Sequence, residues 1–155
     1  MTETDLLVDF LNTLDVEDSL DAIDTDRGWL DWLEEHRLPT PEVQPRRHRT
    51  RARALRDELR AVAAGEESEG VREYPLTLSL AGGEPRLGGE DAVDRIVGTV
   101  ARLAVLGDLG RVKICPADDC RWAFYDTSRN GSRQWCSMAV CGNRAKARAH
   151  RARQA

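Results

Sequence analysis

Four stretches of the chain carry apolar residues at helical spacing. The spacing runs through residues 5–14, 26–37, 45–65 and 90–106. Residues 38–41, which contain two prolines, end the second stretch because proline cannot continue the helical hydrogen-bond ladder. Gly65 and Gly107 suit the left-handed position that ends a helix. The pattern therefore predicts four amphipathic helices, with residues 12–23 as an acidic connection.

One segment changes its period. Residues 74–80 alternate strictly between apolar and other side chains, which is typical of a half-buried strand. Gly82 and Gly83 open a turn toward a short partner strand at 85–88, and residues 66–70 form a polar connection. We expect this single hairpin to pack on the helices in a small α+β body, with Val62 and Ala104 on inward helical stripes. The residues expected to be buried are Leu55, Leu59, Leu76, Leu78, Ile96 and Val100.

The composition is that of a soluble globular protein, with 41% hydrophobic and 32% charged residues. No stretch approaches the roughly 20 apolar residues that cross a bilayer. Residues 1–10 hold three acids and no basic residue, unlike a secretory signal. We therefore expect a cytoplasmic protein that makes no membrane contact, in which disulfides are rare.

Charge divides the chain into two parts. Residues 111–155 hold ten Lys or Arg against three Asp, a net charge of +7, whereas residues 1–110 hold 13 basic and 24 acidic residues, a net charge of −11. A basic segment on an acidic body indicates a module that meets a polyanion. Residues 46–53 are also basic, but Asp57, Glu58 and Glu66 lie nearby, so we interpret that run as a solvated or intramolecularly paired face.

All four cysteines lie in the basic segment, as two pairs with the same four-residue gap: Cys115, Cys120, Cys136 and Cys141. Two close pairs of thiolates are the usual ligand set of a structural zinc ion, whereas catalytic zinc keeps a position for water. Two disulfides or four free thiols are the alternatives. Ser137 is a good N-cap, which would place Cys141 in the first turn of a last helix.

The residues between the cysteine pairs predict a hairpin that turns at Asn130-Gly131, with residues 121–125 as one strand and 132–135 returning toward the metal. This knuckle, hairpin and helix resemble a treble-clef zinc finger. We assign Trp122, Phe124 and Trp135 to a miniature core of the finger. Stacking of one of these rings on a base is the alternative.

The last helix is basic on two flanks. On a helical wheel, Met138, Cys141, Ala145, Ala149 and Ala152 share a face that we expect to look toward the zinc core. A nucleic-acid backbone is the partner that suits the flanks, although a solvated Arg-rich helix is the alternative. The candidate nucleic-acid contacts are Arg144, Arg148 and Arg151 on one flank, Asn143, Lys146 and Arg153 on the other, and Arg129 and Arg133 at the hairpin turn.

From residue 111 onward the sequence closely resembles the CGNR zinc-finger family, named for the motif found here as Cys141-Gly142-Asn143-Arg144. Residues 126, 128–130, 132–133, 135–136 and 146 also fit the family pattern. Residues 8–13 resemble the opening motif of the ABATE domain, which typically precedes this finger. The resemblance implies an ABATE-like α+β domain at 1–110, a CGNR finger at 111–155, and a bacterial, stress-induced transcription regulator.

The sequence thus favours a non-enzymatic, zinc-dependent DNA-binding regulator, since no catalytic spacing of residues is present. We expect it to hold one structural Zn²⁺ per chain. A finger that binds RNA or another protein is the alternative. A homodimer and a small-molecule effector are compatible with this interpretation.

Overall fold

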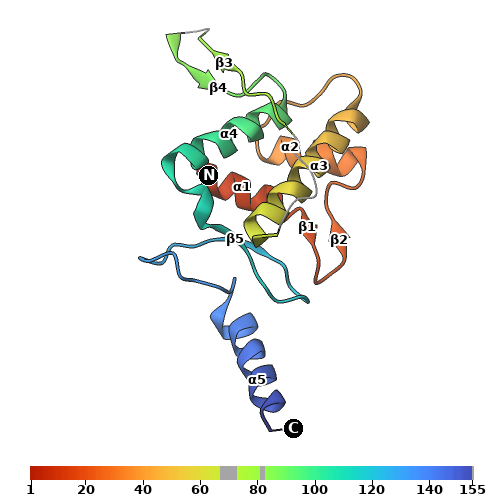
Figure 1. Cartoon of the computed structure of the whole chain (residues 1–155). Helices are drawn as coiled ribbons and strands as arrows, with labels where there is room; N and C mark the ends of the chain where they lie inside the picture. Colours follow the sequence, from red (N-terminus) through yellow and green to blue (C-terminus); the bar gives the residue numbers. More distant parts are fainter. Residues whose placement is uncertain (67–72, 81–82, 155) are drawn as a thin grey trace.

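The computed structural model describes residues 1–66, 73–80 and 83–154 (Figure 1). The predicted connection at 67–70 and Gly82 of the predicted turn lie outside the described residues. The elements in chain order are α1 (Glu3–Leu11), β1 (Leu14–Asp15), β2 (Leu20–Asp21), α2 (Asp26–Glu35), α3 (Pro45–Ala64), β3 (Leu78–Ser79), β4 (Arg86–Leu87), α4 (Ala92–Leu106), the 3₁₀ turn η2 (Leu109–Arg111), β5 (Val112–Ile114), β6 (Ala123–Tyr125), the π-helical turn η3 (Met138–Gly142) and α5 (Asn143–Ala152).

The four predicted helices of the body, α1 to α4, are confirmed. Thr2, Thr25 and Asp91 cap the N-termini of α1, α2 and α4 through their side chains. Gly65 and Gly107 take the predicted left-handed conformation after α3 and α4. No helix in the described part of the chain is long and apolar enough to span a membrane.

The core of the body is centred on α1, which packs against α3 and α4. Phe10 on α1 meets Trp32 on α2 with ring centroids 5.5 Å apart, and Trp32 stacks between Trp29 and His36. Of the residues expected to be buried, Leu55 and Ile96 are buried, while Leu59 and Val100 are half-buried. Val62 and Ala104 are exposed, because the inward stripes of α3 and α4 are narrower than predicted.

The connection at 12–23 contains a hairpin that the sequence pattern did not reveal. β1 and β2 pair antiparallel, with Leu14 opposite Asp21. Two-residue strands are too short to show an alternating pattern. The hairpin is held by Arg56 of α3, which is 1% exposed and donates to Asp21 at 2.7 and 3.0 Å.

The predicted strand at 74–80 is largely wrong. Only Leu78–Ser79 forms a strand, paired with β4, and Leu76, Leu78 and Leu80 are 48%, 58% and 70% exposed. The hairpin projects from the body next to the start of α4 (Figure 1). The residues alternate as predicted, but no other element of the described chain packs over these leucines. The hairpin therefore presents an apolar surface formed by these leucines.

The basic run at 46–53 pairs within the body, as expected, although with other acids. Arg49 donates to Asp26 at 2.8 Å, and Arg51 reaches Asp91 and Asp94, each at 2.8 Å. These pairs tie α3 to the starts of α2 and α4. These basic residues therefore form ion pairs within the body that join its helices.

β5 and β6 form an antiparallel pair that belongs to the main core. Ile114 lies opposite Ala123, and both are buried with Val112 among the body helices. The Asn12 side chain makes two hydrogen bonds to the backbone of Ala123 in β6. Its Nδ2 donates to the Ala123 carbonyl oxygen at 3.0 Å, and its Oδ1 accepts from the Ala123 N–H at 2.7 Å. The β5–β6 hairpin of the finger therefore shares the core of the body, while a second, smaller cluster of buried residues surrounds the cysteines. The division of the chain at residue 110 stays a prediction.

Candidate metal centre and nucleic-acid interface

The first cysteine pair lies in the turn that joins β5 to β6. Cys115 follows β5 directly, and its N–H donates to the carbonyl oxygen of Trp122 at 2.9 Å. The N–H groups of Cys120 and Arg121 both donate to the carbonyl oxygen of Ala117, and Arg121 takes a positive φ of 56°. This tight turn points both sulfurs to one side. The hairpin of the finger is therefore β5–β6, with the first cysteine pair in its turn. The predicted turn at Asn130-Gly131 is present, with Gly131 at a φ of 60° and its N–H donating to the carbonyl oxygen of Ser128 at 3.2 Å, but residues 132–135 form no strand.

The second pair precedes the last helix, close to where the sequence placed it. The Ser137 side chain caps η3 by accepting from the N–H of Val140 at 3.3 Å. Cys141 is buried in η3, and α5 begins two residues later. The predicted cap is confirmed, with a π-helical turn in place of the first α-helical turn.

The four sulfurs lie within 4.8 Å of one another. A tetrahedral site with Zn–S distances of about 2.3 Å has sulfurs about 3.8 Å apart. The Sγ atom of Cys136 lies 3.5 Å from that of Cys120 and 3.7 Å from that of Cys141. The cysteines are free rather than disulfide-bonded. The geometry therefore fits one tetrahedral zinc ion with four protein ligands and no water.

Burial and the closeness of the thiols shift the pKa values of three of the four cysteines. Burial raises the pKa of Cys120 to about 11, and burial followed by the neighbouring thiols raises the pKa of Cys136. Burial would also raise the pKa of Cys115, but hydrogen bonds from the backbone N–H groups of Cys136 and Ala117 bring it below its usual value. Four thiolates at this separation require a cation to balance their charge.

Asp126 organises the loop that returns from β6 to the second pair. Its buried carboxylate accepts from Lys113 at 2.7 Å and from the N–H groups of Ser128 and Arg133, each at 2.9 Å. Burial opposes ionisation, but these hydrogen bonds prevail and hold the pKa of Asp126 well below its usual range. The Lys113 ammonium also donates to the carbonyl oxygens of Gly131 and Arg133. Asp126 and Lys113 therefore set the path of residues 127–135.

The two arginines predicted at the hairpin turn lie in different environments. The Arg133 guanidinium lies 4.8 Å from the centre of the Phe124 ring and donates to the carbonyl oxygens of Trp135 and Cys136. Arg129 is exposed. Phe124 is buried beside the cysteines and Trp135 packs there, but Trp122 is 38% exposed and lies outside this small core.

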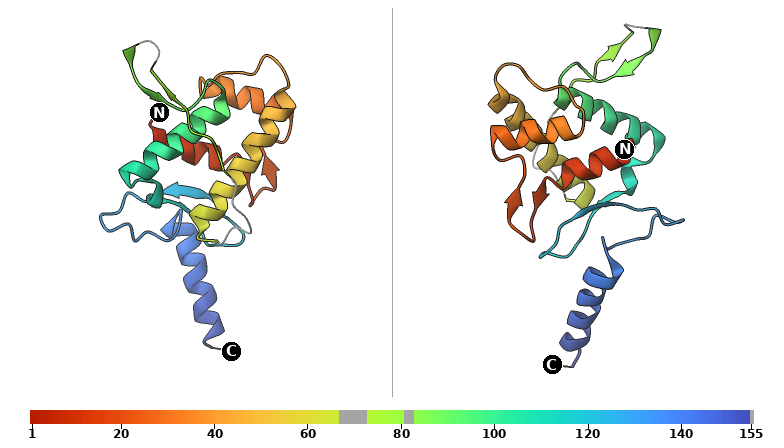
Figure 2. Two further views of the ribbon diagram at one scale, coloured as in Figure 1. Left: turned by 45° about the horizontal axis from the view of Figure 1, so that its top comes forward. Right: turned by 180° about the vertical axis from the view of Figure 1, so that it is seen from behind.

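Helix α5 extends away from the rest of the molecule (Figures 1 and 2). None of its residues is buried. The face expected to look toward the zinc core is buried only at Cys141, whereas Met138, Ala149 and Ala152 are exposed. That expectation was wrong because the metal lies at the start of the helix and nothing lies beside its later turns in the described chain.

The predicted contact residues of α5 fall on two flanks with different neighbours. Arg144 donates to Asp119 at 3.1 Å and lies 3.6 Å from Glu17, and Arg148 lies 3.7 Å from Asp119. Within the part of the chain that the structure describes, no acid pairs with Lys146, Arg151 or Arg153, all of which are exposed. Asn143 is exposed too, and its side chain donates to the carbonyl oxygen of Ala139.

Sequence reasoning missed the residues that join the finger to the body. Arg60 of α3 donates to the carbonyl oxygens of Leu11 and Arg121, each at 2.7 Å. Together with Asn12 it fixes β6 against α1. The sequence did offer one signal, because Arg60 lies on the side of the predicted helix that faces the core. A charged residue is rarely buried without a partner, so this position indicated a hydrogen-bonded contact with another segment.

Comparison with known families matches residues 111–154 to the CGNR zinc finger. A search of curated proteins found no match. The family match and the cysteine geometry together identify this segment as a zinc-binding module with one structural Zn²⁺ held by four cysteines. The ABATE-like nature of residues 1–110 stays a prediction.

Proposed function

We propose that the chain is a non-enzymatic DNA-binding transcription regulator of the bacterial cytoplasm, in which the zinc centre presents α5 to duplex DNA. The carrying observation is the placement of α5. It is a basic helix that begins two residues after the zinc ligand Cys141, and all of its residues from Lys146 to Ala152 are exposed. Its ten residues span about 15 Å. A helix of ordinary diameter fits the DNA major groove, which is about 12 Å wide.

Charge supports a polyanionic partner. Residues 127–155 contain seven Lys or Arg and no Asp or Glu. Positive charge on one protruding element is the electrostatic pattern of nucleic-acid binding. Arg129, at the exposed turn after β6, adds to the same segment.

The two flanks of α5 suit the two walls of a groove. Lys146 and Arg148 project about 160° apart around the helix, at roughly 100° per residue. Phosphates border the groove on both sides, so each flank has a strand to contact. Arg144 and Arg148 would exchange Asp119 for phosphate. That exchange costs little, because exposed ion pairs are weak.

The architecture supports a finger of the treble-clef type. One cysteine pair lies in a β-hairpin turn and the other at the start of a terminal helix, with the metal between them. The metal stabilises a segment that has little core of its own after residue 126. We propose that zinc is required for α5 to hold its position, and hence for binding.

Equilibrium binding of the zinc-loaded chain to a fluorescent duplex of about 20 base pairs, and to a single-stranded RNA of the same length, tests the proposal. We expect binding to the duplex at low salt, weaker binding to the RNA, and loss of binding when a chelator removes zinc. Tighter binding to RNA would replace DNA by RNA as the partner. The absence of binding to both would remove the proposal and favour a protein-binding finger.

A further inference from the structure

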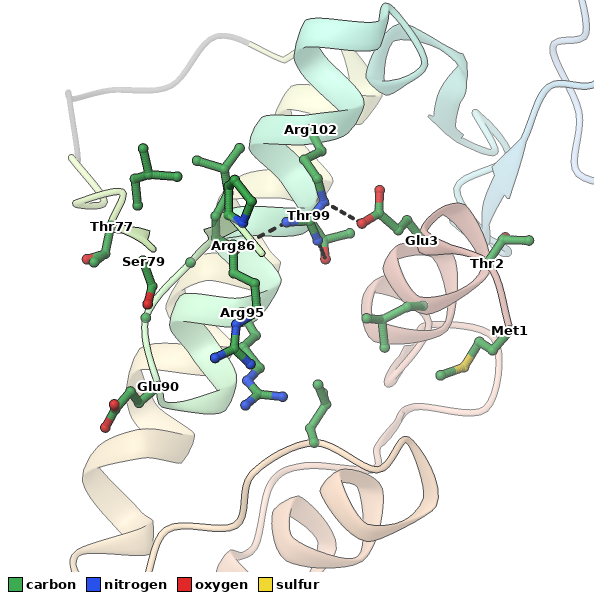
Figure 3. A pocket seen from close by; sticks show the side chains of 17 residues that line it. Met1, Thr2, Glu3, Thr77, Ser79, Arg86, Glu90, Arg95, Thr99 and Arg102 are labelled. Atoms are coloured by element: carbon green, nitrogen blue, oxygen red, sulfur yellow. Dashed lines mark hydrogen bonds and ion pairs between the residues drawn. The ribbon is translucent and has the colours of Figure 1, made fainter. Parts of the chain in front are cut away.

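A second site lies at the opposite end of the molecule from α5. It is a cavity of about 1070 Å³ between the start of α1, the β3–β4 hairpin and α4 (Figure 3). Ligand pockets in proteins measure about 300–1000 Å³. The cavity is therefore large enough for a small organic molecule.

The position of β4 on α4 is fixed. A Cβ atom at Gly98 of α4 would lie 2.4 Å from the carbonyl oxygen of Leu87, so only glycine permits this approach. Arg102 donates to the same oxygen at 3.1 Å, to Thr99 at 3.2 Å and to Glu3 of α1. These contacts join the three elements that surround the cavity and neutralise Arg102.

Two further arginines bring unneutralised charge to the cavity. Arg86 of β4 and Arg95 of α4 direct their side chains toward the same end of the pocket (Figure 3). No side chain among the described residues forms an ion pair or a hydrogen bond with either guanidinium group. Glu90 lies at the edge of the pocket and points away from both (Figure 3). Both side chains are exposed, and an anion bound between them would interact favourably with both charges.

The remaining wall is apolar. Leu6, Leu38 and Leu87 line the cavity and are only half-buried, and Leu78 from the exposed leucines of the hairpin completes this wall. Guanidinium groups recognise carboxylate and phosphate through paired N–H donors. Apolar walls bind through the area that they remove from water.

We propose that this pocket binds an amphipathic organic anion, with a carboxylate or phosphate head held by Arg86 and Arg95 and an apolar body against the leucines. This site is separate from the zinc finger, and its occupancy does not depend on whether α5 binds nucleic acid. The head lies between β4 and α4, and the body extends toward α1. Bound ligand thus connects the hairpin to the helical core.

The test is calorimetric titration of the zinc-loaded full chain with four probes: octanoate, octyl phosphate, octanamide and inorganic phosphate. We expect saturable binding of octanoate or octyl phosphate, and the tighter of the two identifies the head group. Octanamide lacks the charge and inorganic phosphate lacks the apolar body, so each should bind at least about tenfold more weakly.

The variants R86A and R95A should each weaken the octyl anion by about tenfold or more, with unchanged melting temperature and zinc content, because neither side chain has a partner in the described structure. R47A removes an exposed arginine of α3 outside the pocket and serves as the matched control. Octanamide binding as tightly as octanoate, or a double variant R86A/R95A that retains full affinity, would overturn the proposal. So would the absence of binding by both octyl anions at millimolar concentration.

Discussion

Replacing Asn12 with alanine tests whether the finger strand and the body form one unit. The Asn12 side chain makes two hydrogen bonds to the backbone of Ala123, which is 1% exposed. A lost hydrogen bond costs about 0.5–1.5 kcal/mol, and a buried N–H left without an acceptor costs about 1–3 kcal/mol. We therefore expect N12A to lower the free energy of unfolding by about 2–3 kcal/mol. For a chain of this length that corresponds to a fall in melting temperature of about 5–10 °C.

The assay is urea and thermal unfolding of the zinc-loaded protein, followed by tryptophan fluorescence and circular dichroism. N130A is the matched control, because Asn130 is exposed at the turn after β6. The control should stay within about 0.5 kcal/mol of the wild type. An N12A variant as stable as the control would show that the two hydrogen bonds to Ala123 do not stabilise the fold. Separate transitions for finger and body would refute the single cooperative unit.

Three further predictions concern the metal, a close backbone approach and pH. C136S removes a zinc ligand, so amide hydrogen exchange should become faster across residues 127–154 while β5 and β6 stay protected. An equal loss of protection in residues 127–154 and in the two strands would contradict this prediction. G98A places a Cβ 2.4 Å from a backbone oxygen of β4, so it should lower the free energy of unfolding by about 1–3 kcal/mol despite a helix-propensity gain of about 1 kcal/mol. G110A is the control, because a Cβ there meets open space and should not lower the free energy of unfolding. Equal stabilities of the two variants would contradict the close approach of β4 to α4. Burial would raise the pKa of Asp21, but the hydrogen bonds and the charge of Arg56 hold that pKa below its usual value. The ionised Asp21 carboxylate therefore stabilises the fold above about pH 4, and this stabilisation is lost as the pH falls through the lowered pKa. The difference in the free energy of unfolding between the wild type and D21N should become smaller as the pH falls from about 5 to 3. A difference that does not change with pH would show that ionisation of Asp21 does not contribute to stability.

The helices and the zinc ligands were predictable from the sequence because both leave local, periodic signals. Helical spacing located α1 to α4, and proline or glycine marked the ends of α2, α3 and α4. The equal gaps between Cys115 and Cys120 and between Cys136 and Cys141 identified the metal ligands, which the structure brings together.

The remaining features depend on what lies opposite a segment in space. Leu76 and Leu78 alternate correctly, yet they are exposed because the hairpin projects from the body. Asn12 gave no periodic signal, since its role depends on a strand 111 residues away in sequence. The alanine face of α5 looked like a packing surface only because a helical wheel does not show where the body ends.

The salt dependence of duplex binding tests whether α5 meets DNA phosphates on both flanks. Each phosphate contact releases condensed counterions, so log K should fall against log salt by about 0.9 per contact. R148A and K146A should each flatten that slope by about 0.9 and weaken binding alike on all sequences. R27A, which removes an exposed arginine of α2, should leave it unchanged. Unchanged slopes for both α5 variants would remove this helix from the interface.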